Sequence, residues 1–114
     1  MSSRDWKVRI EDMLDALDRI HRYTHGMDRD EFCEDERTFD AVSRNLEIIG
    51  EAARKVPTDI THRYNRVPWS KMAEMRNILI HEYHAVAPEI VWATVLNDLP
   101  PLSAMLRDVL KKEG

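Results

Sequence analysis

Apolar residues recur in the first part of the chain at the spacing of an α-helix. Between about residues 5 and 24 they are three or four positions apart, which places them on one helical face. They are Trp6, Ile10, Met13, Leu14, Leu17 and Ile20. Gly26 follows the stretch and is expected to end it. The pattern predicts an amphipathic helix over about 5–24.

A second apolar stripe predicts a longer helix over about 30–56. Its members alternate steps of three and four residues, and they are Phe39, Val42, Leu46, Ile49, Ala53 and Val56. Such a seam favours packing of helix against helix at a shallow angle, within the subunit or across a dimer. Pro57 lacks the backbone donor that a helix interior needs, so the helix is expected to end there.

The second half of the chain continues the helical pattern. Residues 58–67 are expected to form a connector with one short turn of helix, and a third helix opens at Pro68 and closes in the break at 85–88. A fourth helix follows through Leu99, Pro100-Pro101 interrupts or kinks it, and a short amphipathic helix ends the chain. No sustained period-two alternation predicts a strand. The expected fold is an all-α, up-and-down bundle of four long helices plus a short C-terminal helix.

Composition agrees with a single compact domain spanning residues 1–114. Hydrophobic residues make up 43% of the chain and charged residues 33%, the balance of a globular protein. No apolar run approaches the roughly 20 residues needed to cross a bilayer, and no secretory leader is recognisable. Cys33 is the only cysteine, which excludes an intrachain disulfide. These features lead us to expect a cytoplasmic protein without membrane association.

Charge is unevenly distributed along the chain. The net charge of −4 argues against a protein that coats nucleic acid over its whole surface. Residues 28–40 hold seven acidic and two basic residues, whereas residues 54–76 hold six basic and two acidic ones. Solvated helix faces would account for either run. The basic run is notable because it leads directly into the segment with the most chemistry.

That segment covers residues 76–86 and contains Arg76, Asn77, His81, Tyr83 and His84. RNA cleavage without a metal ion requires that the 2′-hydroxyl lose a proton, that the leaving 5′-oxygen gain one, and that negative charge at phosphorus be countered. Histidine titrates near neutral pH and can act as base or acid, whereas guanidinium stays cationic and binds phosphate oxygens. The segment therefore has the groups that such cleavage needs.

Helical geometry separates two of these groups. At about 100° per residue, Asn77, His81 and His84 share one sector of a straight helix, and Arg76 and Tyr83 share the next. Arg76 and His81 could meet at one phosphate if the arginine bent across, if the helix distorted, or if a second subunit completed the site, which is our expectation. Structural roles also remain open: a helix-end cap for His81, a core aromatic for Tyr83, and a hydrogen bond to His81 for Asn77.

Three segments carry a resemblance to a known family. Arg76, His81 and Tyr83 match the R-x4-6-H-x-Y signature of the HEPN superfamily, and the surrounding residues resemble its HepT branch. Residues 45–53 (NLEIIGEAA) and 97–102 (NDLPPL) are similar to two further segments of that branch. The resemblance covers nearly the whole chain, in order.

The resemblance implies a HEPN-type bundle and a homodimeric, metal-independent ribonuclease that is the toxin of a toxin–antitoxin pair. Arg76 and His81 become the catalytic pair, and Asn77, Tyr83 and His84 bind substrate or support the site. The implied antitoxin is a minimal nucleotidyltransferase, which can transfer AMP to Tyr83. RNA is the implied substrate, no cofactor is expected, and assembly with the antitoxin beyond a dimer stays open. The basic run would lie on the path by which RNA approaches.

Two other interpretations are compatible with the residues. The chain could be a non-catalytic helical interaction module that binds a nucleotidyltransferase partner, with structural roles for its polar helix end. Alternatively, His81 and His84 lie three positions apart and could face one metal ion. Neither paired cysteines nor well-spaced carboxylates accompany them, so we expect no metal.

Overall fold

The computed structural model of the protein describes residues 3–114, which form seven α-helices, one short 3-10 helix and no strand. This confirms the all-α class predicted from the sequence. The elements are α1 (Ser3–Thr24), α2 (Arg29–Glu34), α3 (Glu36–Arg54), α4 (Thr58–Arg63), α5 (Trp69–His81), η1 (Tyr83–Ala85), α6 (Pro88–Asn97) and α7 (Leu99–Glu113). In this part of the chain no helix is both long and apolar enough to span a bilayer.

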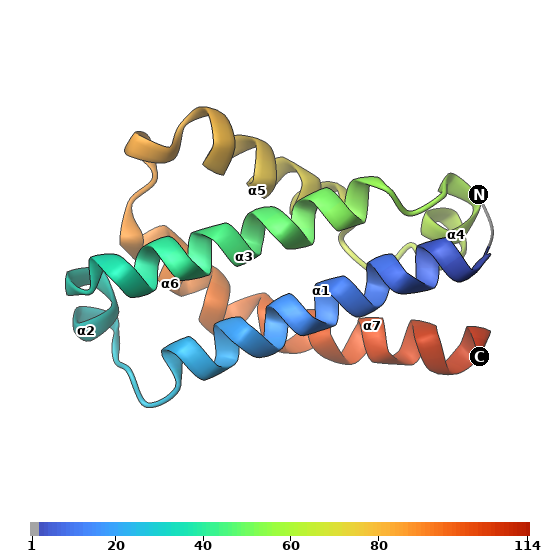
Figure 1. Cartoon of the computed structure of the whole chain (residues 1–114), viewed down its shortest axis with the longest axis horizontal. Coiled ribbons are helices and arrows are strands. Elements are labelled where there is room, and N and C mark those ends of the chain that lie inside the picture. Colours follow the sequence, from blue (N-terminus) through green and yellow to red (C-terminus); the bar gives the residue numbers. More distant parts are fainter. Residues whose placement is uncertain (1–2) are drawn as a thin grey trace.

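The helices form an elongated bundle in which α3 occupies the centre. Figure 1 shows α1 and α3 running side by side, with α5 along the other flank of α3 and α7 along α1. The start of α1 and the end of α7 lie at the same end of the bundle, where Lys7 Nζ donates a hydrogen bond of 3.0 Å to the Glu113 backbone oxygen. The apolar stripes of α1 and α3 predicted from the sequence form much of the buried core.

The predicted second helix is interrupted near its beginning, so the single helix expected over 30–56 is wrong in that part. Asp35 ends α2 and caps α3, and its carboxylate accepts hydrogen bonds from the Thr38 backbone nitrogen (3.0 Å) and hydroxyl (2.8 Å). Those bonds are the main reason that the pKa of Asp35 is lowered. Asp28 caps α2 in the same manner, together with Glu31. The caps let the chain turn and place Phe32 in the core.

The last two helices also differ from expectation. The chain breaks at Asp98, before the two prolines, so Pro100 and Pro101 occupy the first turn of α7. Backbone N–H groups in a first turn have no partner within their own helix, so proline costs little there. Helix α7 has 15 residues and α6 has 10, so the prediction of a short C-terminal helix is wrong.

The connector between α3 and α5 contains one short helix, α4, as predicted. Its end is fixed to the C-terminus of α7, because Arg63 Nη1 donates to both Glu113 carboxylate oxygens at 2.8 and 2.9 Å and the Tyr64 hydroxyl donates to the same group. Hydrogen bonding from Tyr64, followed by that from Arg63, lowers the pKa of Glu113. This contact joins residues about 50 positions apart.

Candidate active site

Helix α5 carries the segment with the most chemistry, but it ends earlier than predicted. Its last residue is His81, and the backbone leaves the helix at Glu82, with φ −131° and ψ 29°. Tyr83 and His84 lie in the 3-10 turn η1 that follows. The expectation that His84 continues the helical face of Asn77 and His81 is therefore wrong, and Tyr83 is free to reach a different helix.

Arg76 is held between α5 and α3. Its side chain is 22% exposed, and its Nε lies 3.2 Å from Glu51 Oε2, an ion pair that is not aligned as a hydrogen bond. Its Nη1 donates to Asn77 Oδ1 at 2.9 Å. Asn77 thus bonds to Arg76, rather than to His81 as one interpretation of the sequence suggested. Both contacts keep the cationic group at the surface of the bundle, where it is positioned to receive an anion.

Gly50 makes this position of Arg76 possible. A Cβ atom at residue 50 would lie 2.3 Å from Arg76 Cβ and 2.5 Å from the Met72 backbone oxygen. No side chain can be accommodated at such separations without movement of one helix, so α3 and α5 approach closely only because residue 50 is glycine. Its role as the contact point for Arg76 was not recognised from the sequence.

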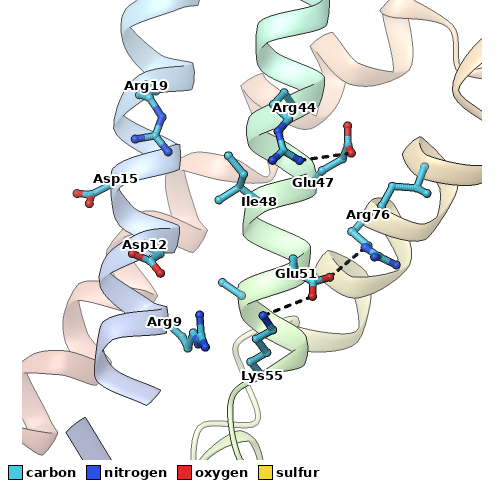
Figure 2. Close-up of a pocket in the computed structure, with 12 residues that line it drawn as sticks. Arg9, Asp12, Asp15, Arg19, Arg44, Glu47, Ile48, Glu51, Lys55 and Arg76 are labelled. Atoms are coloured by element: carbon cyan, nitrogen blue, oxygen red, sulfur yellow. Dashed lines mark ion pairs between the residues drawn. The ribbon is translucent and has the colours of Figure 1, made fainter. Parts of the chain in front are cut away.

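A cavity of about 440 Å³ lies beside Arg76, bounded by α1, α3 and α5. Figure 2 shows both basic and acidic side chains around it, with Glu51 between Arg76 and Lys55. The lining residues are Arg9, Asp12, Asp15, Arg19, Arg44, Glu47, Ile48, Glu51, Ala52, Lys55, Arg76 and Ile80. The cavity is therefore highly charged, and an arginine from the motif forms part of its wall.

His81 does not line this cavity. It is exposed at the end of α5, whereas Ile80, its neighbour, is on the cavity side and is 43% exposed. Arg76 and His81 consequently have different surroundings in the single chain. This agrees with the helical geometry, which separates the two residues on a single straight helix.

Tyr83 is bound to α3 through a residue that the sequence did not identify. Its hydroxyl donates a hydrogen bond to Asp40 Oδ1, and its ring centroid lies 5.7 Å from the ring of Phe39 and 5.7 Å from that of His84. The Asp40 hydrogen bond is the first cause that raises the pKa of Tyr83 to about 12, followed by burial and neighbouring carboxylates. The only indication in the sequence was the acidic run that contains Asp40.

Four of the six basic residues of the predicted run form ion pairs, but they share only two carboxylates. Arg54, Lys55 and Arg76 lie 3.3, 3.7 and 3.2 Å from the same carboxylate, that of Glu51. Arg63 pairs with the C-terminal end of α7. Over residues 3–114, no group of three or more His, Cys, Asp or Glu side chains is arranged to hold a metal ion, so His81 and His84 belong to none.

Comparison with known proteins identifies the family. The model of the family described as ribonuclease HepT-like matches residues 13–109. A protein of Thermococcus cleftensis named a probable ribonuclease HepT is 37% identical over 108 residues, which cover 95% of this chain and 98% of the relative. A protein of Methanocaldococcus jannaschii, provisionally named an RNase, is 37% identical over 111 residues, 97% of this chain and 92% of the relative. No solved structure gives a significant match. The chain therefore belongs to the HepT-like ribonuclease family.

Proposed function

We propose that this chain is an endoribonuclease that works without a metal ion and is the toxin of a toxin–antitoxin pair. Arg76 and His81 are its catalytic residues, and they act at the cleft of a homodimer. Its antitoxin is a minimal nucleotidyltransferase that neutralises the toxin by transferring AMP to Tyr83. Membership in a ribonuclease family supports the RNA substrate, and the match of these three residues to the signature supports their roles.

The observation that carries the proposal is that Arg76 lines a charged cavity, whereas His81 is exposed and does not line it. A two-fold partner covering this face would add its own histidine to the cavity that holds Arg76. Ile80, 43% exposed beside the cavity, and the half-buried Ile48 supply apolar surface for such a contact. A dimer would then contain two equivalent sites, each built from both protomers.

The chemistry follows from the two groups. His81 takes the proton of the 2′-hydroxyl, or delivers one to the leaving 5′-oxygen. The 2′-oxygen forms a bond to phosphorus while the bond to the 5′-oxygen breaks, which leaves a cyclic phosphate. Arg76 stabilises the additional negative charge on the phosphoryl oxygens in the transition state. Adenylylation of Tyr83 would place a bulky anion near this site and hinder binding of the RNA phosphates.

The direct test is cleavage of total RNA by purified protein in the presence of EDTA. We expect the parent to cut RNA and the Arg76→Ala and His81→Ala variants to lose at least about 100-fold in rate, since a general acid or base and a charge-stabilising group each contribute this much. His81 is exposed and Arg76 is partly buried between α5 and α3, and circular dichroism of both variants checks that they fold normally. His62→Ala is the matched control, because His62 is also exposed but lies on α4.

The outcomes separate the possible functions. Cleavage that is abolished by EDTA in the parent would contradict the metal-independent mechanism. Full activity in either variant would remove that residue from the catalytic pair. Absence of cleavage by the parent, with retained binding to a nucleotidyltransferase, would instead favour the non-catalytic interaction module.

A further inference from the structure

Asp40 occupies a position from which it can act on the Tyr83 hydroxyl. It lies one turn into α3 and is exposed, and its carboxylate accepts the hydrogen bond of the phenol across 43 positions of sequence. Tyr83 is on η1, outside any long helix, so this bond and the ring contact with Phe39 define where its oxygen lies. The reactive oxygen and a proton acceptor are thus already in contact in the isolated protomer.

The phenol needs such an acceptor if it is to be a nucleophile. With its pKa raised to about 12, Tyr83 is almost entirely protonated near neutral pH, so spontaneous ionisation supplies very little phenolate. The proton must then leave while the oxygen attacks. A carboxylate that accepts the proton of a hydroxyl during transfer to phosphorus is an established arrangement in phosphoryl transfer.

We propose that Asp40 is the catalytic base for the modification of Tyr83, an inference that rests on the proposed function. The Tyr83 oxygen attacks the α-phosphorus of a nucleoside triphosphate bound by the antitoxin, and a bond forms between them. The bond from the α-phosphorus to the bridging oxygen breaks, and pyrophosphate leaves with the electron pair. The phenolic proton passes to the Asp40 carboxylate and then to solvent. The toxin thus contributes a catalytic group to its own neutralisation.

Neighbouring charged groups provide a matched control. Glu36 and Glu47 lie on the same helix and raise the pKa of Tyr83 through their charge alone, whereas Asp40 also accepts its hydrogen bond. His84 contacts the tyrosine ring from η1. Glu36→Gln therefore removes a nearby negative charge but keeps the Asp40 carboxylate as the proton acceptor. Asp40→Asn replaces that carboxylate with an amide of the same shape, which cannot accept the proton.

The test uses adenosine 5′-phosphorimidazolide, which transfers AMP to a nucleophile with loss of imidazole and requires no antitoxin. We expect mass spectrometry to detect AMP on Tyr83 of the parent. At pH 7 the rate should fall at least about tenfold in Asp40→Asn, change little in Glu36→Gln and recover in part in Asp40→Glu. The same variants are then compared with a purified minimal nucleotidyltransferase and ATP.

Equal or faster labelling of Asp40→Asn would overturn the proposal, because Asp40 would then only restrain the phenol. Absence of label on Tyr83 of the parent with both reagents would also overturn it. The circular dichroism spectrum of Asp40→Asn should match that of the parent and serves as the folding control. AMP labelling of Tyr83 that depends on Asp40 would support the role assigned to Asp40. If the labelled protein still cleaved RNA as fast as the unlabelled one, that result would contradict the proposed function and leave the role of Asp40 intact.

Discussion

At the scale of single residues, the position of Arg76 depends on Gly50 of α3, which has no Cβ atom and lies against the Arg76 side chain. Gly50 lets the backbones of α3 and α5 approach so closely that an added Cβ would lie 2.5 Å from the Met72 oxygen and closer still to Arg76. The guanidinium is then oriented by Glu51 and Asn77. Close approach of two helices is thus coupled directly to the placement of the proposed catalytic arginine.

We expect Gly50→Ala to destabilise the protein by up to about 2 kcal/mol and to reduce RNA cleavage. Alanine gains up to about 1 kcal/mol in helix propensity over glycine, but overpacking against a backbone oxygen costs about 1–3 kcal/mol and cannot be relieved by a change of rotamer. The steric term should therefore win. Urea denaturation measures the free energy of unfolding, and the cleavage assay measures the displacement of Arg76.

Gly26→Ala is the matched control for this prediction. Gly26 has a φ of +80° and open space around its Cα, so alanine there costs about 1–2 kcal/mol through backbone strain alone. The two variants should be similarly destabilised, but only Gly50→Ala should lose cleavage activity under conditions where both are folded. Equal activity in the two would show that Gly50 does not position Arg76.

The sequence reveals some residues of the candidate site, but it does not reveal which residues contact one another in the fold. Arg76, His81 and Tyr83 are recognisable because their spacing is local and matches a signature. Asp40 and Gly50 are not, because their roles depend on partners 43 and 26 positions away, and helical periodicity gives no information about such pairs. Burial, in contrast, followed well from the apolar stripes.

At the scale of helices, capping decides where the elements begin. The Asp35 carboxylate satisfies two donors of Thr38 and separates α2 from α3. An aspartate that can cap a helix is present in the sequence at position 35. The uninterrupted apolar seam that follows it nevertheless favoured one long helix. Likewise, no glycine or proline lies between His81 and Pro88, so periodicity alone could not predict that α5 ends at His81.

We expect Asp35→Ala to lower the Tm by a few degrees at neutral pH, because α3 loses its N-terminal cap. The pKa of Asp35 is depressed from its ordinary value of 3.8, so its stabilisation is complete above that pH and is lost as the pH falls through the lower folded value. The difference in Tm from the parent should thus shrink in acid. Thermal scans at pH 7 and at a series of pH values below 3.8 measure both effects.

Glu34→Ala, a change of the exposed residue next to this cap, is the control and should leave the Tm nearly unchanged. If both alanine variants melted at the temperature of the parent, the two hydrogen bonds at Asp35 would have no energetic importance. A pH-independent loss in Asp35→Ala would point to a cause other than the carboxylate.

At the scale of the whole molecule, the chain forms an elongated body of 42 × 29 × 20 Å, and its charged cavity is lined in part by Ile80, an apolar residue that is 43% exposed. Arg76 belongs to this cavity and His81 does not. Sequence reasoning correctly anticipated that the two side chains diverge on α5. It could not specify which surface a second protomer would cover, because that depends on how α1, α3 and α5 are arranged together.

We expect inactive protomers to complement one another. When Arg76→Ala and His81→Ala proteins are mixed under conditions that exchange subunits, half of the dimers are mixed, and each mixed dimer has one site with both residues intact. About a quarter of the parental activity should return if a site draws one residue from each protomer. The cleavage assay on the mixture, with each variant alone as control, measures this recovery.

Lack of recovery after verified subunit exchange would place both residues of a site in the same protomer. A double variant, Arg76→Ala with His81→Ala, mixed with the parent offers an internal check. In that mixture the hybrid dimers contain no complete composite site. The cleavage activity of the mixture should therefore be lower than that of the same amount of parent protein alone.

The start of α1 and the end of α7 lie at the end of the bundle opposite η1 (Figure 1), where Lys7 and Glu113 are in contact. Purification handles or fluorescent reporters attached at this end of the bundle would therefore lie far from Tyr83. The same proximity would allow a short linker to join the ends and new ones to be opened between α1 and α2. Such a circularly permuted chain would retain every helix contact described above while reversing the order in which α1 and α7 are synthesised.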